Sequence, residues 1–85
     1  MTDREIQEKV NDIFMEEFEI EEDKISKDAQ IFENLGLDSL DVVDLIVALE
    51  KSFGVKINSR ESLQKIKTVG DIYNFISKEQ EKLNS

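Results

Sequence analysis

Residues 37–54 are Leu37-Asp38-Ser39-Leu40-Asp41-Val42-Val43-Asp44-Leu45-Ile46-Val47-Ala48-Leu49-Glu50-Lys51-Ser52-Phe53-Gly54, a stretch that contains both a helix start and a helix stop. Asp38 is a favourable N-cap residue, and Asp41 occupies the third helical position after it. Gly54 stands where a residue in the left-handed conformation commonly ends a helix. This stretch therefore predicts a helix of about four turns.

The predicted helix is apolar on two faces. The core stripe consists of Val42, Leu45, Ile46, Leu49 and Phe53. A second stripe lies well away from it on a helical wheel and is flanked by acids; it consists of Leu40, Val43 and Val47, with Asp41, Asp44 and Glu50 beside it. A small domain can hardly bury both faces of one helix, so the second stripe either contacts the preceding loop, for example at Phe32, or binds a partner.

Upstream, the sequence predicts a helix over residues 3–18 and then a long loop. One helical face carries apolar residues every three or four positions, namely Ile6, Val10, Ile13, Phe14 and Phe18. Thr2 and Glu5 fit a capping box at the start of this helix. From residue 19 to residue 36 the periodicity stops. Scattered apolar residues are expected to anchor this loop to the core, namely Ile20, Ile25, Ile31, Phe32 and Leu35.

Downstream, we expect residues 55–57 to form an extended connector, because no partner strand is available. The pattern Asn58, Glu61, Leu63 and Ile66 predicts one or two turns of a short third helix. Thr68 with Asp71 opens a last helix, whose core stripe is Val69, Ile72, Tyr73 and Ile76. The predicted fold class is therefore all-α: a small four-helix bundle with three longer helices, one short third helix and a long loop between helices 1 and 2.

Length and composition restrict the function. The chain has 85 residues, which predicts a single domain over residues 1–85, and its 20 acids against 11 bases give a net charge of −9. Such a surface repels phosphate groups, so we expect neither nucleic acid nor an anionic membrane as a partner. Since the chain has no Cys and no His, a thiol nucleophile and a Ser-His-Asp triad are excluded. We therefore expect a protein that is not an enzyme and holds no metal.

The charge is unevenly distributed along the chain. Residues 1–50 carry 16 acids and 4 bases, a net of −12, whereas residues 51–85 carry 4 acids and 7 bases, a net of +3. The longest apolar run, Leu45–Leu49, is far shorter than a membrane span, and the N-terminal residues do not form an apolar leader. We therefore expect a cytoplasmic monomer whose partners are basic proteins.

Ser39 is the candidate residue for covalent chemistry. It occupies the first position of the predicted helix, where unpaired N–H groups and the helix dipole favour an anion. Because the chain has no His, the Ser39 hydroxyl lacks a base and is a poor nucleophile by itself, but it is well placed to carry a phosphoester. An isolated Ser at such a position is more often a simple helix-start residue.

The segment Leu35-Gly36-Leu37-Asp38-Ser39-Leu40 resembles the phosphopantetheine attachment motif of acyl carrier proteins, whose core is Asp-Ser-Leu after a Gly. The resemblance extends over nearly the whole chain. It includes Phe32-Glu33-Asn34-Leu35-Gly36, the Leu45–Phe53 run, Val55-Lys56-Ile57 and Thr68-Val69-Gly70-Asp71.

The resemblance implies a carrier that other enzymes use as a substrate. A phosphopantetheinyl transferase would move 4′-phosphopantetheine from coenzyme A to Ser39, and the thiol of this group would hold acyl groups as thioesters for fatty acid, lipid or polyketide biosynthesis. Asp38 would lie near the magnesium ion of the transferase complex. Acyl-transferring and condensing enzymes would dock through basic patches onto Leu40, Asp41, Val43, Asp44, Val47 and Glu50. The acyl chain would fold back between the helices against Leu49, Phe53, Ile57, Leu63 and Ile66.

The chain departs from the family pattern in one region. Typical members are acidic through the connector and third helix, whereas this chain has Lys51, Lys56 and Arg60 at positions where acids or neutral residues are usual. Two alternatives therefore remain beside a fatty acyl carrier. One is a specialised carrier for aminoacyl or D-alanyl groups, and the other is a non-carrier helical adaptor that binds proteins through the Leu40, Val43 and Val47 stripe.

Overall fold

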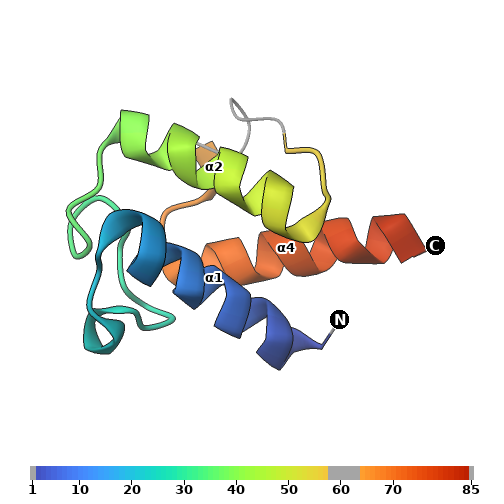
Figure 1. Cartoon of the computed structure of the whole chain (residues 1–85), viewed down its shortest axis with the longest axis horizontal. Helices are drawn as coiled ribbons and strands as arrows, with labels where there is room; N and C mark the ends of the chain where they lie inside the picture. Colours follow the sequence, from blue (N-terminus) through green and yellow to red (C-terminus); the bar gives the residue numbers. More distant parts are fainter. Residues whose placement is uncertain (1, 58–63, 85) are drawn as a thin grey trace.

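Helices make up the regular structure of residues 2–57 and 64–84, which are the residues that the computed structural model describes (Figure 1). The elements in chain order are α1 (Asp3–Phe18), the short 3-10 helix η1 (Glu22–Lys24), α2 (Ser39–Phe53) and α4 (Val69–Asn84). The prediction of an all-α fold is confirmed. Among the described residues, none of the helices has the length and apolarity that crossing a membrane needs.

The segment between α2 and α4 begins as expected. Gly54 ends α2 in the left-handed conformation with φ 66°, and its N–H donates to the Glu50 carbonyl oxygen at 2.9 Å. Residues 55–57 follow without helix or strand structure. The predicted short third helix falls mostly on residues 58–63, which lie outside the described residues, and the next two residues, Gln64 and Lys65, are helical.

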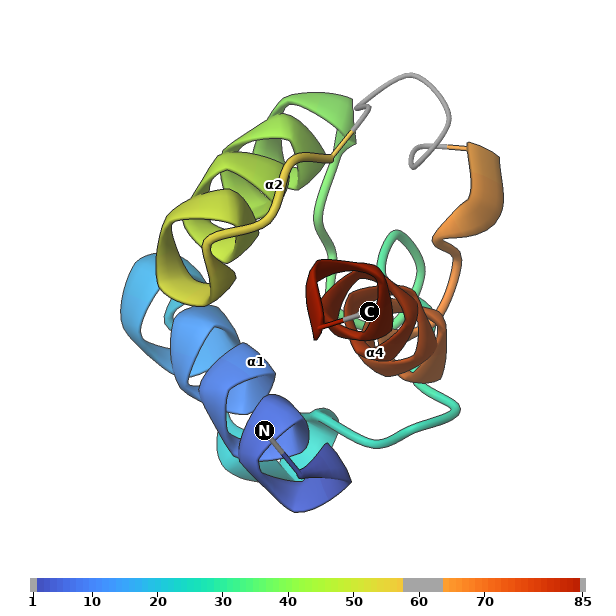
Figure 2. The ribbon, with the colours of Figure 1, turned by 90° about the vertical axis from the view of Figure 1, so that its right-hand side faces the viewer.

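A single hydrophobic core lies between the three α-helices. The view in Figure 2 runs nearly along α4 and shows α1 and α2 together on one side of it. The largest fully buried side chains come from all three helices and from the segments between them: Phe14, Ile31, Leu45, Leu49, Ile66, Ile72 and Ile76. Each predicted core stripe therefore faces the same core, since burying apolar surface is the main favourable term in folding.

The loop between α1 and α2 is anchored by apolar side chains, with one exception. Ile20 and Ile31 are buried, and Ile25 and Leu35 are partly buried against the core. The prediction that Phe32 is another anchor is wrong, because its side chain is 41% exposed. Since the adjacent Ile31 occupies the core position at this turn, the Phe32 ring is left on the surface.

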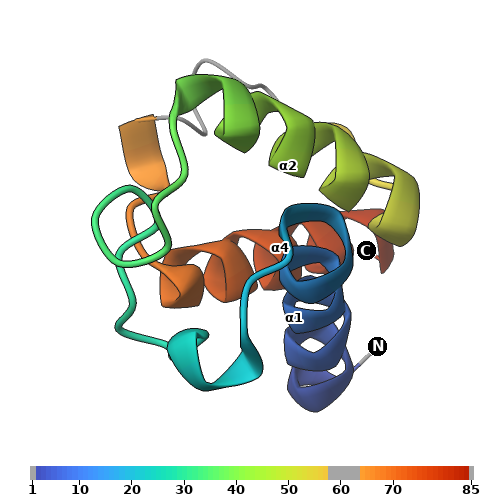
Figure 3. The same ribbon diagram turned by 60° about the vertical axis from the view of Figure 1, so that its left-hand side comes forward.

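Main-chain hydrogen bonds fasten this loop to the start of α4 (Figure 3). The Ile31 N–H donates to the Lys67 carbonyl oxygen at 2.9 Å, and the Gly70 N–H donates to the Lys27 carbonyl oxygen at 2.9 Å. An isolated antiparallel bridge lies between these two contacts. The loop that precedes α2 is thus held by two parts of the molecule, the core and the first turn of α4.

The C-terminal end of α2 is held from three sides. Gln80 of α4 donates its Nε2 hydrogen to the Phe53 carbonyl oxygen at 3.3 Å. The Lys9 Nζ of α1 lies 5.5 Å from the centroid of the Phe53 ring, which is within the range of a cation–π contact. The Ile57 N–H donates to Glu50 Oε2 at 3.3 Å. These contacts fix the far end of α2 relative to both neighbouring helices and to the connector.

A polar contact also joins α1 to α4. The Tyr73 hydroxyl donates to Asn11 Oδ1 at 2.5 Å. Partial burial raises the pKa of the Tyr73 hydroxyl, while its hydrogen bond to Asn11 works in the opposite direction. The contact thus links two partly buried residues of α1 and α4 that are 62 positions apart in the chain.

The acid cluster after the middle of α1 predicts a stability that depends on salt. The cluster consists of exposed residues, namely Glu16, Glu17, Glu19, Glu21, Glu22 and Asp23. We expect the melting temperature to rise from low to moderate salt, and to rise further with calcium or magnesium, because exposed like charges are screened over about 8 Å at physiological ionic strength. Thermal unfolding followed by circular dichroism measures this, and a flat or falling melting temperature contradicts it.

Candidate functional site

The start of α2 is fixed by a reciprocal capping box. Asp38 Oδ1 accepts the Asp41 N–H at 2.9 Å, and Asp41 Oδ2 accepts the Asp38 N–H at 3.2 Å. Leu37, just before the cap, is buried, and its N–H donates to the Ile31 carbonyl oxygen at 3.2 Å. Gly36 has φ 72°, a conformation in which glycine is favoured. The prediction of Asp38 as N-cap is confirmed, and the loop and cap together determine where Ser39 lies.

Ser39 is the first residue of α2, and its side chain is exposed. The first helical N–H groups have no partner within the helix, so this end of α2 attracts negative charge. A phosphoester on the Ser39 hydroxyl would place its phosphate where these groups favour it. The exposed hydroxyl also leaves room for a long group that extends into solvent. The residues present therefore fit a phosphate-linked prosthetic group, whereas the His-free chain supplies no histidine base for catalysis at Ser39.

An apolar stripe continues from Ser39 along the outer face of α2. Leu40 is 77% exposed, Val43 41% and Val47 43%. In the described part of the chain these three and Phe32 are the exposed large hydrophobic residues. The preceding loop therefore does not bury Leu40 and Val43. A cluster of unpartnered apolar side chains around one helix end is typical of a surface that binds another protein.

The three acids predicted beside this stripe differ in their surroundings. Asp44 is exposed, whereas Asp41 and Glu50 are half-buried. The Asp41 carboxylate belongs to the capping box, and the Glu50 carboxylate accepts the Ile57 N–H of the connector. No sequence pattern indicated the Glu50 contact, because Ile57 lies beyond the end of α2. Of the three acids, Asp44 is the exposed one.

The residues expected to contact an acyl chain lie in the core. Leu49, Phe53, Ile57 and Ile66 are all buried, and Leu63 lies outside the described residues. They belong to one continuous cluster of buried side chains. Leu49 and Phe53 reach this core from α2, whereas Ile57 and Ile66 reach it from the segment between α2 and α4. Sequence reasoning did not predict that Phe32 lies on the surface, because no periodic pattern distinguishes it from the buried anchors of the same loop.

Comparison with known proteins supports the resemblance that the sequence motif around Ser39 indicates. The sequence model described as "Phosphopantetheine attachment site" matches residues 8–76. An acyl carrier protein of Akkermansia muciniphila is 39% identical over 80 residues, which cover 94% of this chain and 99% of that protein. An acyl carrier protein of Thermotoga maritima is 43% identical over 74 residues, which cover 87% of this chain and 90% of that protein.

Proposed function

Because this chain belongs to the acyl carrier protein family, a family that carries 4′-phosphopantetheine, we propose that Ser39 is the residue that bears this group. Membership makes the protein an acyl carrier and a substrate of a phosphopantetheinyl transferase, rather than a catalyst. When attached, the group supplies the thiol that a Cys-free chain lacks and binds acyl groups as thioesters. The observation that carries the assignment is the exposed Ser39 hydroxyl at the first position of a capped helix.

The neighbours of Ser39 have two roles in this proposal. Asp38 caps α2 through one carboxylate oxygen, Oδ1, and this contact holds its side chain beside the modified residue. Asp38 is therefore placed to approach the magnesium ion of the transferase complex with its second oxygen. Leu37 and the capping box hold the Ser39 backbone in one position, which lowers the entropy cost when an enzyme binds the site.

Partner enzymes dock along the outer face of α2. The exposed side chains of Leu40, Val43 and Val47 supply apolar contact area, and Asp44 supplies charge. Since a rim charge acts mainly on the rate of association, Asp44 steers basic surfaces toward this face. Asp41 and Glu50 contribute charge to the same face, although each carboxylate also has a structural partner.

The acyl chain is proposed to enter the core beside Leu49, Phe53, Ile57, Leu63 and Ile66. The described members of this set all belong to the hydrophobic core, so an acyl chain that enters here replaces contacts between apolar side chains with similar contacts to itself. We further propose a single carrier domain over residues 1–85, with the short third helix after the connector, and a monomer in the cytoplasm. The pathway proposed first is fatty acid or related lipid or polyketide biosynthesis.

Mass spectrometry of the intact chain tests the proposal. The chain purified from its own cells should carry one phosphopantetheine, and the mass of any attached group identifies the acyl class. The same addition should follow incubation of the unmodified chain with coenzyme A and a broad-specificity transferase. A non-carrier adaptor gains no mass in either experiment, and a carrier for aminoacyl or D-alanyl groups shows an amino acid on the thiol.

The basic residues in the last turn of α2 and in the segment after it predict a preference among partner enzymes. A partner with a basic surface for all-acidic carriers meets like charge at Lys51, Lys56 and Arg60. We expect a ketosynthase or acyltransferase of general fatty acid synthesis to use this chain poorly, and the variant with all three residues changed to Glu to be used better. The rate of transacylation or crosslinking measures this. Equal rates, or a slower variant, contradict the preference without affecting the assignment as a carrier.

A further inference from the structure

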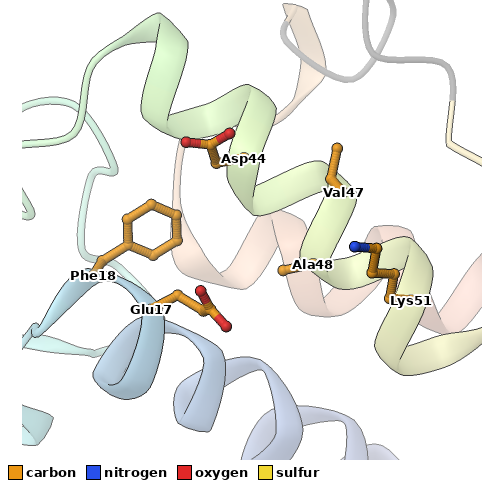
Figure 4. Close-up of a pocket in the computed structure, with 6 residues that line it drawn as sticks. All are labelled: Glu17, Phe18, Asp44, Val47, Ala48 and Lys51. Atoms are coloured by element: carbon orange, nitrogen blue, oxygen red, sulfur yellow. The ribbon is translucent and has the colours of Figure 1, made fainter.

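A hollow of about 260 Å³ lies between the last turn of α1 and the middle of α2 (Figure 4). Its lining residues are Glu17, Phe18, Asp44, Val47, Ala48 and Lys51. Glu17 and Phe18 form the α1 wall, and the other four residues form the α2 wall. Apolar side chains and exposed charges therefore meet at one concave place on the surface.

Two features of the helices leave this hollow unfilled. Ala48 presents only a methyl group where α2 passes the end of α1. Phe18 is half-buried, and its ring leans on that of Phe14, with the ring centroids 6.4 Å apart and the planes at 49°. Since an apolar cavity of about 150 Å³ holds a molecule as large as benzene, this hollow has room for one aliphatic or aromatic side chain.

The charges around the hollow are complementary to a basic ligand at one end. Glu17 and Asp44 are exposed, and neither forms an ion pair within the part of the chain that the structure describes. Figure 4 shows Asp44 and Lys51 at opposite ends of the α2 wall. A ligand that carries a base is therefore attracted at the Asp44 end and repelled at the Lys51 end, so that the charges give the ligand a direction.

The hollow is continuous with the docking face of α2. Val47 belongs both to the exposed stripe and to the lining of the hollow. Val47 lies eight residues after Ser39, about 12 Å along the helix axis. A phosphopantetheinyl transferase must contact the Ser39 hydroxyl itself, and a typical interface covers about 800 Å² on each partner, a patch of roughly 16 Å radius. The footprint of a transferase centred on Ser39 therefore reaches the hollow.

We propose that this hollow is an anchor pocket for the phosphopantetheinyl transferase, and that it receives one apolar side chain of that enzyme with a Lys or Arg beside it. The proposal rests on the proposed function, namely that Ser39 is modified and that partners dock along α2. It extends the docking surface from α2 to α1 and makes Glu17 and Phe18 part of it.

Two adjacent acids on α1 provide a matched test of the charge at the hollow. Glu17 lines the hollow, whereas Glu16 is equally exposed and does not. The variants E17Q and E16Q have the same net charge, so long-range steering is the same in both. With coenzyme A and a purified transferase, we expect E17Q to raise the KM for the chain by at least about threefold with kcat unchanged, and E16Q to stay near the native value.

Filling the hollow tests the apolar contact. We expect A48L to occupy the space of the anchor side chain and to raise the KM by about tenfold, because the few side chains that fill well-packed, desolvated pockets carry most of the binding energy of an interface. Q7L is the control, since Gln7 is exposed on α1 and far along the helix from the hollow. Circular dichroism and the melting temperature report whether each variant is folded.

The outcomes separate this proposal from the proposed function. Equal KM values for E17Q and E16Q overturn the anchor pocket, as does a folded A48L chain with a native KM. If A48L does not fold, the comparison of E17Q with E16Q decides. If the hollow instead joins two copies of this chain, A48L changes the oligomeric state measured by size-exclusion chromatography, and that result also overturns the proposal. If native chain gains no phosphopantetheine at Ser39, the proposed function itself fails, and the anchor pocket fails with it.

Discussion

Replacing Ser39 by Ala is expected to abolish the addition of phosphopantetheine, while the native chain gains one group. The variant removes the only atom of residue 39 that can accept the phosphoester, and no other side chain stands at that position of α2. Its melting temperature should stay close to the native value, because the Ser39 side chain is exposed and Ala is favourable in a helix. Intact mass after incubation with coenzyme A and a transferase measures the addition.

The matched control for this variant is Ser52→Ala. Ser52 is exposed and lies in the last turn of α2, so its replacement makes the same chemical change on the same helix. We expect this control to be modified at the native rate. Phosphopantetheine found on the Ser39→Ala chain would show that another residue carries the group. The melting temperatures of both variants show whether any loss of modification comes from unfolding.

The Gly70→Ala variant is expected to lose about 2 kcal/mol of unfolding free energy. A Cβ atom at Gly70 would lie 2.8 Å from Lys27 Cγ and 2.9 Å from the Lys27 carbonyl oxygen. The carbonyl oxygen cannot move away freely, because it accepts the Gly70 N–H at 2.9 Å. The clash therefore separates the loop from the first turn of α4. For a domain of this size the expected fall in melting temperature is roughly 10 °C.

Two control variants separate this clash from other effects of losing a glycine. Gly54→Ala tests backbone strain alone, because Gly54 has φ 66° and a Cβ atom added there would have no neighbouring atom within 4 Å; we expect a loss of about 1 kcal/mol. Lys27→Ala combined with Gly70→Ala removes the Cγ contact but keeps the carbonyl contact, so most of the loss should remain. Full recovery of stability in the double variant would assign the effect to the Lys27 side chain instead.

The sequence by itself determined the two helices α1 and α2 and the place of Ser39 at the start of α2. The bounds of α1 and α2 were predicted because their ends carry local signals, such as Asp38 with Asp41 at the start of α2 and Gly54 at its end. Side chains three or four residues apart share one face of a helix, so the core stripes were also predicted. The two-faced pattern of α2 also indicated a second apolar stripe, which either contacts the loop or binds a partner, and the structure leaves this stripe exposed.

Only the tertiary structure decided which side chains of the loop and of the helix ends face solvent. Phe32 and Ile31 are adjacent large apolar residues, so the sequence predicts the same anchoring role for both. In the structure the Ile31 side chain is buried in the core, whereas the Phe32 side chain lies on the surface. The contact of residues 27–31 with the start of α4 and the hollow beside Ala48 each join segments that are far apart in the chain. Helix periodicity repeats over a few residues, whereas these features depend on how two elements approach each other in space, which no local pattern records.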